Sequence, residues 1–192
     1  MADDVRNLAI LFADVSGSTR LYETLGDAEA LATIGRCLAL VRSACEGHGG
    51  RLIKTIGDEA MVMFAEADQA AEAAAEMQAR ISGQPLCDRV RIAIRVGFNF
   101  GPAIEVENDV FGDSVNVAAR MVGLAKGEQV ILSEQTVAAL TPSLRSRVRQ
   151  IDSLTVKGKH DDIAIYELLW QDSEAELTAI EHAGLSVFVV FQ

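Results

Sequence analysis

One short stretch restricts the fold more than any other part of the chain. Residues 52–64 (LIKTIGDEAMVMF) contain two apolar runs separated by Gly57 and Asp58. Glycine tolerates the positive φ that tight turns often need, so this pattern predicts a β-hairpin that holds the carboxylate of Asp58 at its tip. Taken alone, the segment fits equally well an ordinary hairpin with a solvated aspartate.

A second acid follows an apolar run upstream, because residues 8–14 (LAILFAD) end on Asp14. If the next helix crosses the sheet in the usual right-handed sense, strands 8–14 and 51–56 run parallel and end at one edge. Asp14 and Asp58 then converge, with no other evident charge partner. Two converging carboxylates repel each other unless a cation lies between them, and oxygen ligands suit Mg²⁺ or Mn²⁺. The sequence therefore predicts a metal site for phosphate chemistry.

Composition excludes some partners. The 192 residues are 49% apolar, which suits one domain with a short piece left over. A net charge of −11 argues against nucleic acid or an anionic membrane as the partner, because such proteins need a basic face. Cys37, Cys45 and Cys87 show no metal or disulfide spacing, and no run suits a membrane span. We expect a cytoplasmic protein with reduced, buried thiols and no membrane segment.

Hydrophobic periodicity predicts strands and helices in a familiar order. After the first strand, Asp27 can cap a helix that Gly47 to Gly50 end, and the hairpin at 51–64 follows. A helix over 67–82 and a strand over 90–96 complete the order strand, helix, strand, strand, helix, strand. This is the ferredoxin-like βαββαβ core of an α+β fold, with an antiparallel sheet and helices on one face.

The rest of the chain is predicted to add a C-terminal α/β subdomain. A hairpin over 96–106 should turn at Gly101-Pro102, and a helix should begin at Asp113 or Ser114. The further elements are a strand at 129–132, a helix at 133–140, and strands at 148–151 and 163–168. We expect one domain over 1–170. Residues 171–192 then form a linker and an apolar run that suits pairing with the domain, with another copy, or with a further domain.

Two polar residues share a face of the helix that follows residue 113. Asn116 and Arg120 are four positions apart, so both side chains can point into one cleft. Considered by itself, the helix is better explained by a surface Asn and by an Arg whose side chain extends over the core than by a cleft.

Four motifs occur in the order of one known family. They are 12–19 (FADVSGST), 54–59 (KTIGDE), 109–120 (DVFGDSVNVAAR) and 157–159 (KGK). Over residues 8–169 they closely resemble the catalytic domain of class III nucleotidyl cyclases, and most of all bacterial adenylate cyclases.

The resemblance implies a role for each matching residue. The metal-binding aspartates match Asp14 and Asp58, and the base-recognising pair matches Lys54 and Asp109. The residues that steady the ribose and the transition state match Asn116 and Arg120. The triphosphate lysine matches Lys157 or Lys159. The backbone amides that open the first helix can hold the outer phosphates; they belong to Val15, Ser16, Gly17, Ser18 and Thr19.

The resemblance also implies a reaction and an assembly. The ribose 3′-oxygen of ATP attacks the α-phosphorus and gives cyclic AMP and pyrophosphate, with two Mg²⁺ or Mn²⁺ ions per site. Two copies of the chain would share each site. Three alternatives remain: a guanylate cyclase, a catalytically silent cyclase-like module that binds a nucleotide or a partner, and another palm-like enzyme such as a diguanylate cyclase or polymerase. The last lacks its Gly-Gly-Asp-Glu-Phe turn here.

Overall fold

A mostly antiparallel sheet forms the centre of the molecule. The computed structural model describes residues 5–155 and 162–171. Strand β1 (Val5–Val15) lies between β3 (Glu59–Phe64) and β4 (Ile94–Val106), and β2 (Arg51–Ile56) pairs with β3. All three pairings are antiparallel, so β1 and β2 run in the same direction, as predicted, with β3 between them. The predicted hairpin is confirmed, and Gly57 adopts a φ of 64° at its turn.

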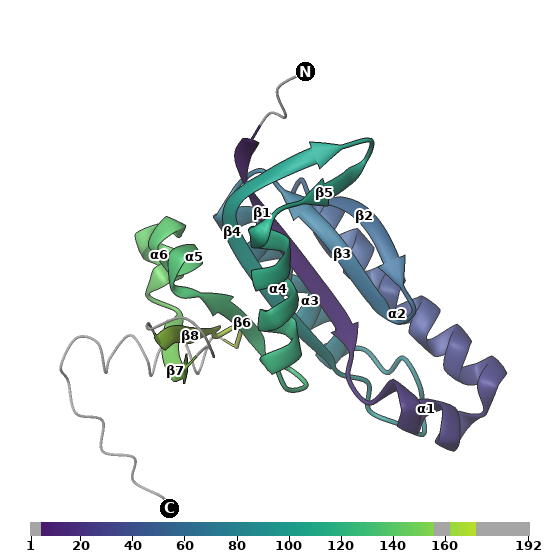
Figure 1. The fold of residues 1–192 in the computed structure, drawn as a ribbon. Helices are drawn as coiled ribbons and strands as arrows, with labels where there is room; N and C mark the ends of the chain where they lie inside the picture. Colours follow the sequence, from purple (N-terminus) through teal and green to yellow (C-terminus); the bar gives the residue numbers. More distant parts are fainter. Residues whose placement is uncertain (1–4, 156–161, 172–192) are drawn as a thin grey trace, which may run out of the picture.

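Two helices, α2 (Asp27–Gly47) and α3 (Ala67–Gly83), pack on one face of this sheet, and a short helix, α1 (Ser18–Leu25), packs against α2 (Figure 1). Alanines of α3 such as Ala70 and Ala74 are fully buried in one cluster with Leu11 of β1 and Val41 of α2. Helix α2 is present where it was predicted, but Asp27 is its first helical residue and Gly26 takes the capping position predicted for Asp27. The ferredoxin-like core of an α+β fold is confirmed.

The opposite face is covered by a helix that lies outside the ferredoxin-like core. Helix α4 (Asp113–Leu124) packs its Ala118 and Val122 onto Leu8 and Ile10 of β1. Figure 1 shows α4 in front of the sheet and α2 behind it. The prediction of helices on one face holds for α2 and α3 of the ferredoxin-like core, and α4, which follows that core, covers the other face because the apolar residues of β1 are buried on both faces.

The hairpin predicted at Gly101-Pro102 was also wrong. Strand β4 passes straight through these residues, and the chain turns at Glu107 and Asn108 before β5 (Asp109–Phe111). Pro102 is tolerated because it lies between the part of β4 that pairs with β6 and the part that pairs with β5. Both turn residues have positive φ, 47° and 68°, as in a two-residue type I′ turn.

The predicted C-terminal α/β subdomain is present and extends the same sheet. Its elements are β6 (Val130–Ser133), α5 (Glu134–Ala139), α6 (Pro142–Arg145), β7 (Val148–Thr155) and β8 (Asp162–Leu168). Among the described residues, the eight strands follow the order β2-β3-β1-β4-β6-β8-β7, with β5 on β4. Strand β4 begins at Ile94 and not at residue 90. Lys157, Lys159 and the terminal run within 172–192 lie outside the described residues.

Two further expectations concern the burial of the three thiols and the question of a membrane-spanning helix. Cys37 and Cys45 are fully buried, and burial raises the pKa of each thiol to about 12. Cys87 is partly exposed, and all three thiols are free. None of the helices in the described part of the chain combines the length and apolar character that crossing a membrane requires.

Candidate active site

Three charged residues form a row across the end of the sheet. Asp14 of β1 lies directly opposite Glu59 of β3 on one side and Arg95 of β4 on the other. Residues directly opposite each other in an antiparallel pair point to the same face. The Asp14 side chain is 9% exposed, its Oδ2 accepts a hydrogen bond from Nε of Arg95 at 2.6 Å, and Nη2 of Arg95 lies 2.5 Å from the same oxygen in an ion pair. Asp14 therefore has a charge partner, contrary to the sequence-based expectation.

The carboxylates of this row repel one another. The pKa of Asp14 is raised because burial removes water from the carboxylate and because Asp58 is close; Arg95 acts in the opposite direction. The pKa of Glu59 is also raised, first by burial and then by Asp14, with Asp58 adding to the effect. The predicted convergence of Asp14 and Asp58 is thus present as an electrostatic interaction. Three carboxylates face one guanidinium here, so the end of the sheet keeps an excess of negative charge.

The oxygen donors suit a hard divalent cation that the substrate helps to hold. Over 5–155 and 162–171, no three His, Cys, Asp or Glu side chains are grouped so as to form a metal site by themselves. Mg²⁺ commonly uses only one or two carboxylates and completes its shell with water and substrate phosphates. The Arg95 guanidinium already contacts this buried carboxylate, so a metal ion would have to replace that contact.

The loop between Asp14 and α1 offers fewer free amides than predicted. The Val15 amide donates to the Asp58 carbonyl at 3.4 Å, and the Ser16 amide donates to the Ala93 carbonyl at 2.9 Å. Gly17 caps α1 with a φ of 72°, and the first turn of α1 contains no acid. The amides left for an anion are those of Gly17, Ser18 and Thr19, at the positive end of a helix.

The two predicted base-recognising residues contact each other. Nζ of Lys54 on β2 lies 2.9 and 2.7 Å from the two carboxylate oxygens of Asp109 on β5. The hydrogen bond from Lys54 lowers the pKa of Asp109, and the Val110 amide adds to this effect. Residues 55 positions apart in the sequence are therefore joined by an ion pair.

Asn116 and Arg120 lie on the exposed side of α4. Ala118 and Val122 pack this helix onto the sheet. At the start of α4, the Ser114 hydroxyl donates a hydrogen bond to the Pro102 carbonyl. Within the described residues, neither side chain has a hydrogen bond or ion pair. Both groups are therefore available for a ligand or another chain.

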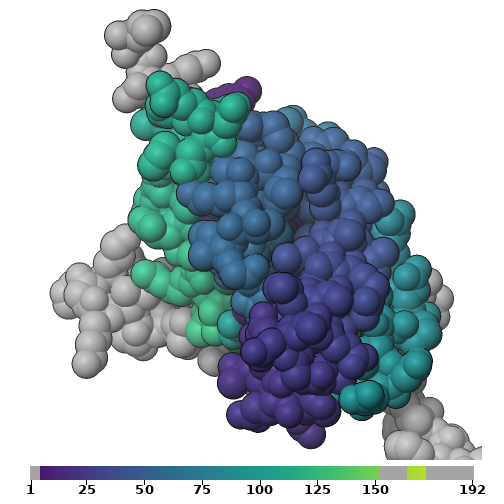
Figure 2. All heavy atoms as spheres, turned by 90° about the vertical axis from the view of Figure 1, so that its right-hand side faces the viewer, coloured from purple at the N-terminus to yellow at the C-terminus, as the bar shows by residue number. Residues whose placement is uncertain are grey.

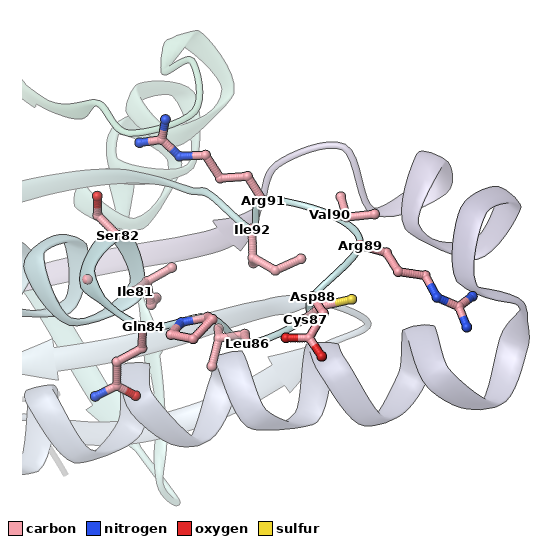
Figure 3. Close-up of a pocket in the computed structure, with 12 residues that line it drawn as sticks. Ile81, Ser82, Gln84, Leu86, Cys87, Asp88, Arg89, Val90, Arg91 and Ile92 are labelled. Carbon is pink, nitrogen blue, oxygen red and sulfur yellow. The ribbon is translucent and has the colours of Figure 1, made fainter.

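Three hollows are present in the described part of the chain, and none of them is lined by these residues. A hollow of about 420 Å³ lies beyond the end of α3, and residues 81–92 line it. In Figure 3, Arg89 and Arg91 extend away from this hollow in different directions. A second hollow borders α6 and a third lies around Arg6, and neither is lined by a predicted site residue.

Comparison with known proteins decides the family. The sequence profile of the "Adenylate and Guanylate cyclase catalytic domain" matches residues 1–169. The chain belongs to this family. Adenylate cyclase of Anabaena cylindrica is 31% identical to this cyclase chain over 193 residues, which cover 87% of the chain and 38% of that protein. Adenylate cyclase of Streptomyces coelicolor is 36% identical over 133 residues, covering 66% and 32%.

Solved structures agree with the cyclase fold. The adenylate/guanylate cyclase/hydrolase of Silicibacter pomeroyi superposes with a TM-score of 0.72 at 28% identity, covering 86% of this chain and 98% of that one. The matched part of the curated relatives is much smaller, since this cyclase chain covers 38% and 32% of the two adenylate cyclases named above.

Sequence reasoning missed Arg95 and Glu59 of the cyclase domain. Both lie on strands whose alternation is visible in the sequence, and Arg95 stands between the apolar Ile94 and Val96. Alternation gives the face of a strand but not the residue that lies opposite. The register of β1 with β3 and β4 was needed to place both beside Asp14.

Proposed function

We propose that this protein is an adenylate cyclase that converts ATP to 3′,5′-cyclic AMP and pyrophosphate. The ion pair between Lys54 and Asp109 is the observation that carries the proposal. Adenine has an amino donor at C6 and an acceptor at N1, which a carboxylate and an ammonium group can satisfy together. Guanine reverses both groups, so it would leave both side chains mispaired.

The first prediction concerns this choice of base. Each buried mispairing costs about 1 to 3 kcal/mol, so kcat/KM for ATP should exceed that for GTP by on the order of 10³-fold. The guanylyl cyclases that this chain resembles carry Glu and Cys at these positions. Lys54→Glu with Asp109→Cys should therefore erode the preference. Purified protein is incubated with each nucleotide and Mn²⁺, and the products are separated by chromatography; equal kcat/KM values in the wild type would refute the assignment.

Asp14 and Asp58 would hold two Mg²⁺ or Mn²⁺ ions at the end of the sheet. When bound, such ions lower the pKa of the ribose 3′-hydroxyl and neutralise phosphate charge. The amides of Gly17, Ser18 and Thr19 would bind the outer phosphates at the start of α1. Arg95 is half exposed, so its guanidinium can leave Asp14 and face the substrate when another cation takes that carboxylate.

The exposed residues of α4 would act on the reacting atoms. Arg120 can donate to the charge that builds on the α-phosphoryl oxygens, and Asn116 can orient the ribose. Lys157 or Lys159 would add a cation for the triphosphate. No protein nucleophile is needed, because the ribose oxygen attacks directly.

We further propose that two copies of the chain share each site. Asp14 and Asp58 would come from one subunit, and Lys54, Asp109, Asn116 and Arg120 from the other. Two features support this arrangement: Asn116 and Arg120 have no partner among the described residues, and none of the hollows described above is lined by these groups. In a head-to-tail dimer, each of the two equal clefts receives one set of residues from each subunit, so a single kind of chain supplies two complete sites.

The second prediction follows from the shared site. Asp14→Ala protein and Arg120→Ala protein should each be nearly inactive, but their mixture should regain activity. A heterodimer has one cleft with both changes and one with neither, so free exchange at equal amounts restores about a quarter of the wild-type rate. Native mass spectrometry checks that subunits exchange. If exchange is complete and no activity returns, or if the enzyme is fully active as a monomer, the sites are not shared.

A further inference from the structure

Opposite charges face each other between β2 and the outer end of the β4–β5 hairpin. We call residues 103–111 the arm. The arm carries Glu105 and Asp109, and β2 carries Arg51 and Lys54. Nη2 of Arg51 donates to Oε1 of Glu105, and Lys54 contacts Asp109 at 2.7 Å. Figures 1 and 2 both show the arm beside β2 at one end of the sheet.

Among the described residues, strand pairing holds only the first two residues of the arm, since Ala103 and Ile104 pair with β1, so side chains hold the rest of the arm against β2. In the described part of the chain, β5 pairs with β4 alone. Glu105 also accepts a hydrogen bond from Arg6 at the start of β1, so one carboxylate joins guanidiniums from two strands. The Glu105 side chain is 27% exposed, which limits the competition from water. Ala103 and Val110 of the arm share an apolar cluster with Met61 of β3 beneath these ion pairs.

The turn of the arm transmits the position of Glu105 to Asp109. Val106 pairs directly with Asp109, and Glu105 pairs with Val110. Only Glu107 and Asn108 lie between the two strands of the arm. With so short a loop, a shift of β4 at Glu105 moves Asp109 as well.

The contact between Lys54 and Asp109 cannot by itself fix the arm during binding. Both side chains must redirect hydrogen bonds from each other to the base, and this weakens their own ion pair. Glu105 has no such task, so its two ion pairs can persist when the nucleotide is bound.

We propose that Glu105 is a positioning residue for nucleotide selection. It holds the arm against β2 through Arg51 and Arg6, and so fixes the spacing of Lys54 and Asp109 that suits adenine. The inference rests on the proposed function, in which this pair recognises the base.

Glu105→Gln tests the inference, with Glu46→Gln as its matched control. Glu46 accepts a hydrogen bond from Arg42 on α2 at 2.7 Å, so the control removes one similar surface ion pair elsewhere. In Glu105→Gln we expect KM for ATP to rise about tenfold and the ATP:GTP ratio of kcat/KM to fall about tenfold, with kcat for ATP within about twofold of wild type. Arg51→Gln should act in the same direction. The double variant should lose less than the two single losses combined, because both remove one contact.

Hydrogen exchange gives a readout that does not depend on the preferred nucleotide. Amides of β5 should exchange faster in Glu105→Gln than in wild type or Glu46→Gln. An unchanged ATP:GTP ratio, a loss in kcat alone, or unchanged exchange of β5 would each overturn the inference. Equal use of ATP and GTP by the wild type would refute the proposed function instead, and the exchange of β5 would still decide whether Glu105 holds the arm.

Discussion

Asp14→Asn should abolish cyclic nucleotide formation while leaving the fold intact. Removing one donor to a transition state typically costs on the order of 10² to 10³ in rate, and loss of a metal ligand should cost more. The asparagine keeps the size of the aspartate but removes the charge that would bind the cation. In Asp14→Asn, Arg95 loses its charged partner, but it is 39% exposed and can be solvated.

Initial rates over a series of Mn²⁺ concentrations measure this effect. Asp58→Asn should behave in the same way, because both carboxylates are proposed to hold the ions. Asp88→Asn is a suitable control, since Asp88 is an exposed acid on the loop after α3. Circular dichroism and Tm should remain near those of the wild type. A single Asp14 or Asp58 variant that keeps half the wild-type rate would show that the metal assignment is wrong.

Gly97→Ala should cause the largest loss of stability. At this position of β4, a Cβ would lie 1.9 Å from the Val122 amide nitrogen and 2.4 Å from the Met121 carbonyl carbon. Both atoms belong to the backbone of α4 and cannot turn away as a side-chain tip can. Overpacking in a core costs about 1 to 3 kcal/mol and occasionally more, so we expect a loss of at least about 3 kcal/mol.

Gly35→Ala provides the opposite result in the same protein. Gly35 lies on the exposed side of α2, and an added Cβ would meet nothing within 4 Å. Alanine in a helix interior should raise the free energy of unfolding by about 0.5 to 1 kcal/mol. Urea unfolding of both variants measures the two effects. A Gly97→Ala protein as stable as the wild type would mean that α4 does not pack so closely on β4.

The sequence predicted best where one strong local signal acted alone. Gly57 between two apolar runs predicted the β2–β3 hairpin, and helical periodicity predicted α3. Gly101-Pro102 misled the prediction, because a Gly-Pro pair is typical of turns whereas here both residues remain in an extended strand. The actual turn at Glu107 and Asn108 contains no glycine, and its positive φ values are maintained by the pairing of β4 with β5.

From the sequence, the site could be predicted only where it depends on the position of a residue along one strand. Asp14 lies one residue before the end of β1 and Asp58 lies in the turn after β2, so topology alone was enough to bring them together. Arg95 beside Asp14 depends on which residue of β4 lies opposite, and the ion pairs of Glu105 depend on which strands lie beside the outer end of β4. Both are properties of register and of tertiary contact, which a local pattern does not contain.

The β2–β3 hairpin has a consequence for how two active sites would work together. Lys54 and Asp58 lie four positions apart on it, yet in the proposed dimer one belongs to the base pocket of one cleft and the other to the metal pocket of the second. If nucleotide binding in one cleft tilts the hairpin, the hairpin residue that belongs to the other cleft would therefore move as well. In the proposed dimer the two clefts would be linked through this hairpin, so nucleotide binding in one cleft would change the turnover rate of the other.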